Sequence, residues 1–175
     1  EIISEPERDV LGEEIDRFTW TGSGMNQYKC GISWDWDHDW MWLSSYDGNK
    51  IAAVDPSWDY EVQVEWNTAR PMDNAYFEGI LYQIPWSNNR IDLWNTNGDL
   101  IRSHALPWRP TAIAADYANR VLLVVNEADW SLRVFSIDDN LREIAIIRNM
   151  RQFTADAAFR SMDFINNHYF DPGRN

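Results

Sequence analysis

The sequence has a single cysteine, few basic residues and no long apolar run. Cys30 alone cannot form an intrachain disulfide or a cysteine-rich zinc site, so we expect it to be a small apolar strand residue. Only 15 lysines and arginines stand against 28 aspartates and glutamates, and the formal net charge of −13 excludes the basic field that nucleic-acid binding needs. No apolar run approaches the roughly 20 residues of a transmembrane helix. We therefore predict no nucleic-acid partner and no transmembrane segment.

Catalytic signatures are absent as well. We find no G-x-S-x-G, no Walker A loop, no H-E-x-x-H and no G-x-G-x-x-G at a strand–helix turn. Asp35, Asp37 and Asp39 have the spacing of the start of an EF-hand loop, but Trp40 and Tyr46 stand where that loop needs glycine and glutamate. The three histidines occupy unrelated positions. We predict no catalytic residue, no cofactor and no metal ligand, although sequence alone does not show whether two carboxylates face each other across a cleft.

Tryptophan is the residue that the chain has in excess. Its 175 residues suffice for one domain with a core, and 45% hydrophobic and 25% charged residues are ordinary for a soluble globular protein. Eleven tryptophans are not ordinary. Indoles in such number must be buried, stacked on one another, or used as contact surface.

Internal repeats explain much of this composition. Three segments align without gaps: ISWDWDHDWMWL (32–43), IAADYANRVLLV (113–124) and RSMDFINNHYFD (160–171). Each has an acidic–aromatic pair, then a polar turn and an apolar run. A looser copy, MDNAYFEGILYQ (72–83), keeps the aromatic residue and loses the acidic one. The first positions of the pairs are residues 35, 75, 116 and 163, so successive copies are 40, 41 and 47 residues apart.

The segments after each apolar run also repeat. Further short strands are predicted at 50–55 and 60–66, at 90–95 and 100–106, and at 132–138 and 141–147, separated by turns rich in Asp, Asn, Gly and Ser. Four-stranded units at about 40-residue spacing are typical of β-propeller blades. We therefore predict an all-β chain with three full units and the first half of a fourth.

The segment 112–138 resembles a blade of the NHL-type or YVTN-type β-propellers in the order of its features. Arg109-Pro110-Thr111 fits the start of such a blade, and Arg70-Pro71 recurs before the second unit. The resemblance covers about residues 30–171. It implies a β-propeller-like array of four-stranded antiparallel blades: either a small four-bladed ring, in which RFTWTG (17–22) completes the last blade, or an open arc whose edge is covered by a partner or a second copy.

The two ends of the chain differ from the repeats. Residues 1–16 are strongly acidic and are predicted to form an extended arm, residues 17–171 the propeller-like domain, and residues 172–175 a loose C-terminal end. The sequence starts with neither Met nor a signal peptide. That start fits an exported and processed chain, which favours an extracytoplasmic location, and it also fits a truncated one.

Five aromatic residues are predicted to lie in loops on one face. Tyr46, Trp86 and Trp130 fall in the turn between the second and third strands of a unit, and Trp66 and Trp108 lie near the connections between units. These loops share one face of a propeller, so the five residues would form an exposed contact surface. The alternative is that each indole folds over its own blade. The other strand tryptophans, namely Trp34, Trp36, Trp40, Trp42 and Trp94, are expected to pack between blades.

Three functions are compatible with these patterns. The first is a non-catalytic protein-interaction or scaffold subunit of a larger assembly, docking on a protein partner or a second copy through its loop face, its open edge or its acidic arm. The second is a glycan-binding propeller in which Trp86, Trp108 and Trp130 stack on sugars. The third is a metal-dependent hydrolase or lactonase with loop carboxylates in a central channel.

Overall fold

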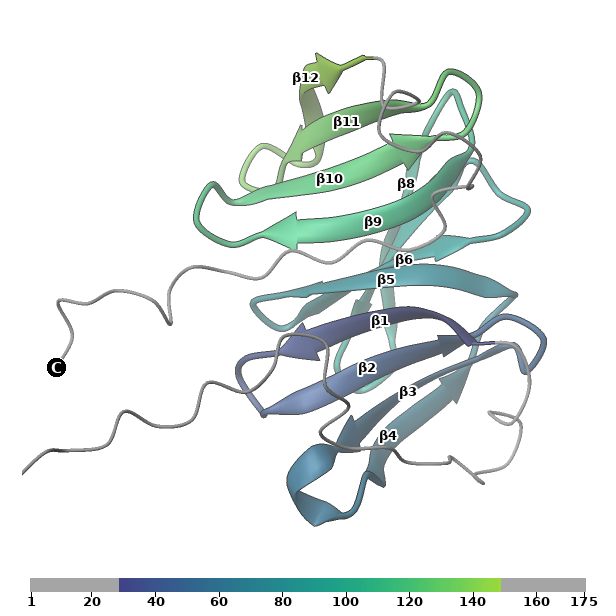
Figure 1. Ribbon diagram of the computed structural model, residues 1–175, viewed down its shortest axis with the longest axis vertical. Coiled ribbons are helices and arrows are strands. Elements are labelled where there is room, and N and C mark those ends of the chain that lie inside the picture. The colour runs from purple at the N-terminus through teal and green to yellow at the C-terminus, as the bar shows by residue number, and fades with distance from the viewer. Residues whose placement is uncertain (1–28, 149–175) are drawn as a thin grey trace, which may run out of the picture.

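The computed structural model describes residues 29–148 as twelve strands in three four-stranded antiparallel sheets (Figure 1). Blade 1 consists of β1 (Lys29–Asp35), β2 (Trp40–Ser45), β3 (Lys50–Asp55), the 3-10 helix η1 (Pro56–Trp58) and β4 (Glu61–Asn67). Blade 2 consists of β5 (Pro71–Phe77), β6 (Ile80–Pro85), β7 (Arg90–Asn95) and β8 (Leu100–Ala105). Blade 3 consists of β9 (Pro110–Asp116), β10 (Val121–Asn126), β11 (Ser131–Ser136) and β12 (Arg142–Ile147). The four-stranded units predicted from the repeats are confirmed.

Four predicted segments fall outside the described residues. These are the acidic arm (1–16), the strand 17–22, the hairpin 160–171 and the C-terminal end (172–175). Among the described residues, no helix is long and apolar enough to cross a membrane.

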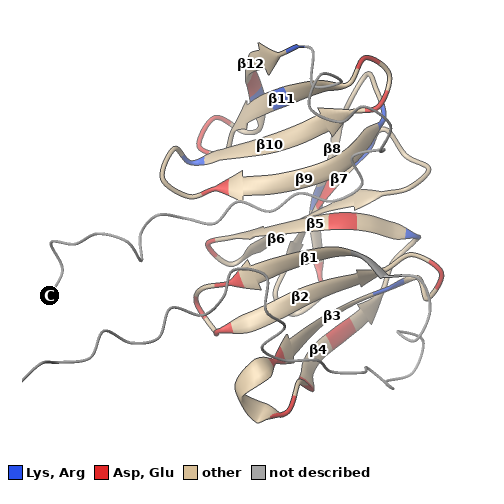
Figure 2. Ribbon diagram, viewed as in Figure 1, with Lys and Arg blue, Asp and Glu red and all other residues tan. Residues whose placement is uncertain are grey.

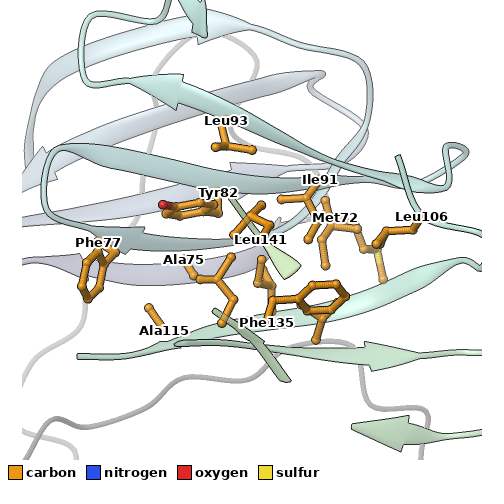
Figure 3. Close-up of a cluster of buried hydrophobic side chains, with 14 residues drawn as sticks. Met72, Ala75, Phe77, Tyr82, Ile91, Leu93, Leu106, Ala115, Phe135 and Leu141 are labelled. Carbon is orange, nitrogen blue, oxygen red and sulfur yellow. The ribbon is translucent and has the colours of Figure 1, made fainter. Parts of the chain in front are cut away.

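The strands of each blade follow one another in chain order, and the inner strands β1, β5 and β9 lie side by side (Figure 1). The inner strands β5 and β9 are buried along their whole length, whereas the outer strand of the middle blade, β8, alternates between exposed and half-buried residues. The core therefore lies between the sheets. Between blades 2 and 3, Met72, Ile91, Leu93 and Phe135 belong to one apolar cluster (Figure 3). Between blades 1 and 2, the corresponding cluster contains Trp42, Ile51, Tyr76 and Leu81.

Asp73 on β5 is buried between the other two inner strands. Its Oδ2 accepts a hydrogen bond at 2.8 Å from the backbone N–H of Ile113 on β9. On the other side, Gly31 of β1 approaches so closely that a Cβ built there would lie 2.6 Å from the Asp73 Cα. Only glycine fits at this point of contact between blades 1 and 2.

The acidic residue of the repeat caps the turn after the first strand. Asp35 accepts two backbone N–H groups of its turn, at 2.9 and 3.1 Å, and the indole N–H of Trp42 at 3.1 Å. Its equivalent in blade 3, Asp116, accepts the backbone N–H and the side-chain amide of Asn119, at 3.2 and 2.7 Å. The aspartate at position 35 thus stabilises a hairpin turn, as its place beside a predicted turn indicated.

The aromatic residue of the pair connects blades 2 and 3 each to the preceding blade. In blade 2, where Ala75 replaces the acid, the hydroxyl of Tyr76 accepts the N–H of Gly79 at 2.9 Å and donates to the carboxylate of Asp37 in blade 1. Burial and this bond to Asp37 raise the pKa of Tyr76 well above its usual value. In blade 3, the hydroxyl of Tyr117 donates to the carbonyl of Tyr76 at 2.8 Å.

The strand tryptophans differ in how far they are buried. Trp42 is fully buried between blades 1 and 2, as predicted, and Trp34, Trp40 and Trp94 are half-buried. Trp36 leaves 36% of its surface exposed. It is equivalent in the repeat to Tyr76 and Tyr117, which contact the preceding blade. The segments predicted to complete a blade beside blade 1 (17–22 and 160–171) lie outside the described residues, so the packing of Trp36 between blades stays a prediction.

Candidate interaction surface

The loops predicted to share a face lie at one end of the sheets and are joined by backbone hydrogen bonds. The N–H of Trp86, in the β6–β7 turn, donates to the carbonyl of Arg70 in the connection between blades 1 and 2 at 2.9 Å. The N–H of Glu127, in the β10–β11 turn, donates to the carbonyl of Arg109 in the next connection at 3.0 Å. Each connection is therefore held against the second turn of the blade that it enters.

Two of the predicted aromatic residues meet across the first pair of blades. The rings of Tyr46 and Trp86 have their centroids 5.4 Å apart and stand edge to face, at 87°. The guanidinium of Arg70 lies 5.5 Å from the Tyr46 centroid, and that of Arg109 lies 4.0 Å from the Trp86 centroid. We call these four residues the arginine–aromatic ladder.

Trp108 forms a second group beside the ladder. Its ring lies 6.1 Å from that of Phe135, and the guanidinium of Arg133 lies 5.5 Å from its centroid. Arg133 also pairs with Asp129 at 2.9 Å and with Glu143 at 3.2 Å. Hydrogen bonds from Ser131, together with Arg133, hold the pKa of Asp129 below its usual value.

The other two predicted residues do not contact the ladder residues in any described ring contact. Trp66 is part of β4 and packs between blades 1 and 2, with its ring centroid 5.3 Å from that of Trp42 and 5.8 Å from that of Trp94. Trp130, in the β10–β11 turn, packs against the apolar cluster of blade 3 that contains Leu132. The structure thus brings together Tyr46 and Trp86, with Trp108 in the next loop, whereas Trp66 packs between blades 1 and 2 and Trp130 packs against its own blade.

The two ends of the sheets differ in charge. Figure 2 shows acidic residues where β1 and β9 end and basic residues near the opposite ends of β3 and β5. The end without the ladder carries Asp37, Asp39, Asp59, Glu78, Asp99, Asp138 and Asp139 in its turns. Arg120 joins Glu78 and Asp138 there, at 2.6 and 2.9 Å, which connects blades 2 and 3. Within residues 29–148, no group of three or more His, Cys, Asp or Glu side chains is arranged to hold a metal ion.

Sequence reasoning did not single out the arginines of the ladder. Arg70 and Arg109 both precede a proline that starts an inner strand, and this repeated Arg-Pro pair was the only available signal. The pair marks where the connections are, but it does not reveal that each guanidinium lies over an aromatic ring in the second turn of the preceding blade.

A second exposed surface lies on the outer strand of blade 3. In β12, Ile144, Ile146 and Ile147 are 46%, 37% and 49% exposed. The equivalent strand of blade 1, β4, exposes Glu61, Gln63 and Glu65 instead. Charged and polar side chains normally protect an edge strand from pairing with another chain, and β12 lacks that protection over its last four residues.

Comparisons with known proteins identify the fold and no family. No protein-family model and no curated protein matches the chain. The fold is similar to that of hydrazine synthase from Kuenenia stuttgartiensis, with a TM-score of 0.60 and 15% identity over 86% of this chain and 42% of that one. It is also similar to a chain of the mitotic checkpoint complex, with a TM-score of 0.59 and 14% identity over 79% of this chain and 43% of that one.

Both similar structures contain β-propeller domains, and the present chain spans less than half the length of each. The chain is therefore all-β, with a propeller-like array of antiparallel blades. No repeat family is identified, so the NHL-type or YVTN-type assignment stays a prediction.

Proposed function

We propose that this chain is a non-catalytic, β-propeller-type interaction subunit that docks on a protein partner. The observation that carries the proposal is the exposed isoleucine run of β12, which is an edge strand among the described residues 29–148 and offers both side chains and backbone groups for pairing. An extended segment of a partner could add to this edge, with its apolar side chains against Ile144, Ile146 and Ile147. In the mitotic checkpoint structure, a chain of similar fold is part of a protein complex. This supports the proposal only by analogy.

The arginine–aromatic ladder fits a protein partner better than a glycan. A sugar stacks on an open indole face, but Arg109 already covers one face of Trp86, and Arg133 lies over Trp108. Aromatic and arginine side chains that are held in place by each other are typical of protein contact surfaces, because little side-chain entropy is lost when they bind. No contact among the described residues favours the glycan-binding or the hydrolase alternative.

The test compares the protein with a variant in which Ile144, Ile146 and Ile147 are threonine, which keeps the preference for a strand and removes the apolar surface. The wild-type chain, isolated from its source under native conditions, should have a mass above that of one chain, and the variant should lose the associated protein. Gln63→Thr, on the equivalent strand β4, is the matched control and should keep it. A monomeric wild-type chain with no associated protein, or a triple variant that retains the partner, would contradict the proposal.

A further inference from the structure

A row of polar side chains crosses blade 2 on the face that packs against blade 1. Asn74 on β5, Gln83 on β6 and Asp92 on β7 are direct cross-strand neighbours, so their side chains lie on the same face of the sheet. All three residues are buried. By the spacing of the repeats, Gln83 corresponds to Leu43 in blade 1 and Val124 in blade 3. The fold of a blade therefore does not require a polar residue at this position.

Both ends of the row have partners. The Asn74 side chain accepts a hydrogen bond from the hydroxyl of Ser33, and its Nδ2 donates to the hydroxyl of Ser44 at 2.7 Å, so it is fixed to blade 1. Asp92 accepts a hydrogen bond from the hydroxyl of Ser103 and forms an ion pair with Arg90, whose Nε lies 2.8 Å from the Asp92 Oδ1.

The middle of the row is different. Gln83 is 0% exposed, and neither its Oε1 nor its Nε2 has a hydrogen-bond partner among the described residues. An amide that gives up its bonds to water and gains none in return destabilises the fold, and buried amides in folded proteins almost always have a protein or water partner. Polar neighbours stand on both sides of Gln83 in the adjacent strands, so a bridging molecule would find further partners there.

We propose that this row binds one or two internal water molecules, which bridge the amide of Gln83 to the carboxylate of Asp92 and to the side chain of Asn74. Water suits the site because the amide needs both an acceptor for its N–H groups and a donor for its oxygen. A cation is disfavoured because Arg90 already neutralises Asp92, and an anion is disfavoured by Asp92 itself. The row would then join blades 1 and 2 through a hydrated polar layer, whereas the cluster between blades 2 and 3 is apolar.

Gln83→Met tests the proposal because methionine keeps the length of the side chain and removes both polar atoms. If water bridges the row, the variant loses the hydrogen bonds between Gln83 and that water, and the melting temperature should fall by about 3–6 °C. If Gln83 has no partner at all, the variant removes two unpaired buried groups and should melt at the same temperature or higher, which would overturn the proposal. Gln63→Met, at an exposed position of β4, is the matched control and should leave the melting temperature unchanged.

A high-resolution crystal structure of the wild-type protein tests the site directly and does not depend on the variant folding. We expect an electron-density peak of water within hydrogen-bonding distance of the Gln83 Oε1 or Nε2, and no such peak in Gln83→Met. A wild-type map without that peak, or with a peak that scatters like a metal ion, would refute the water site. Neither experiment depends on the proposed interaction function.

Discussion

Replacing Gly31 with alanine should force the inner strands of blades 1 and 2 apart. The new Cβ would lie 2.6 Å from the Cα of Asp73 and 2.9 Å from the backbone nitrogen of Asn74. Because both are backbone atoms, no side-chain rotation relieves the overlap, and β1 must move relative to β5. The carboxylate of Asp73, 2.7 Å from the new Cβ, would move as well, and with it the hydrogen bond from Ile113 of blade 3.

Overpacking of this kind costs roughly 1–3 kcal/mol. Urea denaturation of a small domain has a slope of about 1–3 kcal/mol per molar, so the midpoint of Gly31→Ala should fall by about 1 M. Gly79→Ala is the control: nothing lies within 4 Å of its Cβ position, but its φ of +80° favours glycine. That variant should lose only the conformational contribution, about 1 kcal/mol.

Hydrogen exchange separates the two variants even if their midpoints are similar. The backbone N–H of Ile113 should exchange faster in Gly31→Ala, because its acceptor Asp73 is displaced. In Gly79→Ala its exchange rate should change only as much as the global stability does. A Gly31→Ala protein with the wild-type midpoint and wild-type exchange at Ile113 would show that the contact between β1 and β5 is looser than described.

Three further predictions concern the ladder, the core and the acidic turn. Arg109→Ala removes the guanidinium above Trp86 and should lower stability by about 1 kcal/mol and change the intrinsic fluorescence, while Arg142→Ala, an exposed arginine, should do neither. Burial raises the pKa of Tyr82 from 10.0 to about 12, so the folded state favours the neutral phenol. This contribution to stability is present below pH 10 and is lost as the pH rises through 12. The urea midpoint of Tyr82→Phe should therefore fall less over that pH range than the midpoint of the wild-type protein. An equal fall in both proteins would contradict the assignment. Asp37 and Asp39 belong to a hairpin turn and not to a calcium loop, so neither calcium nor EDTA should shift the melting temperature.

Local patterns were sufficient to predict the blades. The strands alternate with turns at short, regular distances along the sequence. Each blade also contains an apolar run, because that strand is buried on both faces, and this run can be recognised in every repeat. The role of Asp35 could be predicted for the same reason, because the backbone N–H groups that it caps lie only two and three residues away.

Contacts between residues about 40 positions apart could not be predicted in this way. Tyr76 and Tyr117 look like Trp36 in the repeat, but each hydroxyl reaches the preceding blade, and Trp36 has no described blade to reach. Trp66 and Trp86 both fall near predicted loops, yet the first is packed against Trp42 and the second lies under Arg109. Sequence position places a side chain near a loop, and only the neighbouring blade decides whether it is covered.

The sequence by itself determined the all-β character, the four-stranded unit and the turns that separate its strands, because these depend on residues close together in the chain. The tertiary structure decided which aromatic residues meet arginines, why Gly31 must be glycine and where Gln83 is buried without a hydrogen-bond partner among the described residues. Each of those features depends on the face that one blade presents to the next. The repeat makes these faces alike in sequence, but each face packs against a different neighbour, so equivalent residues make different contacts.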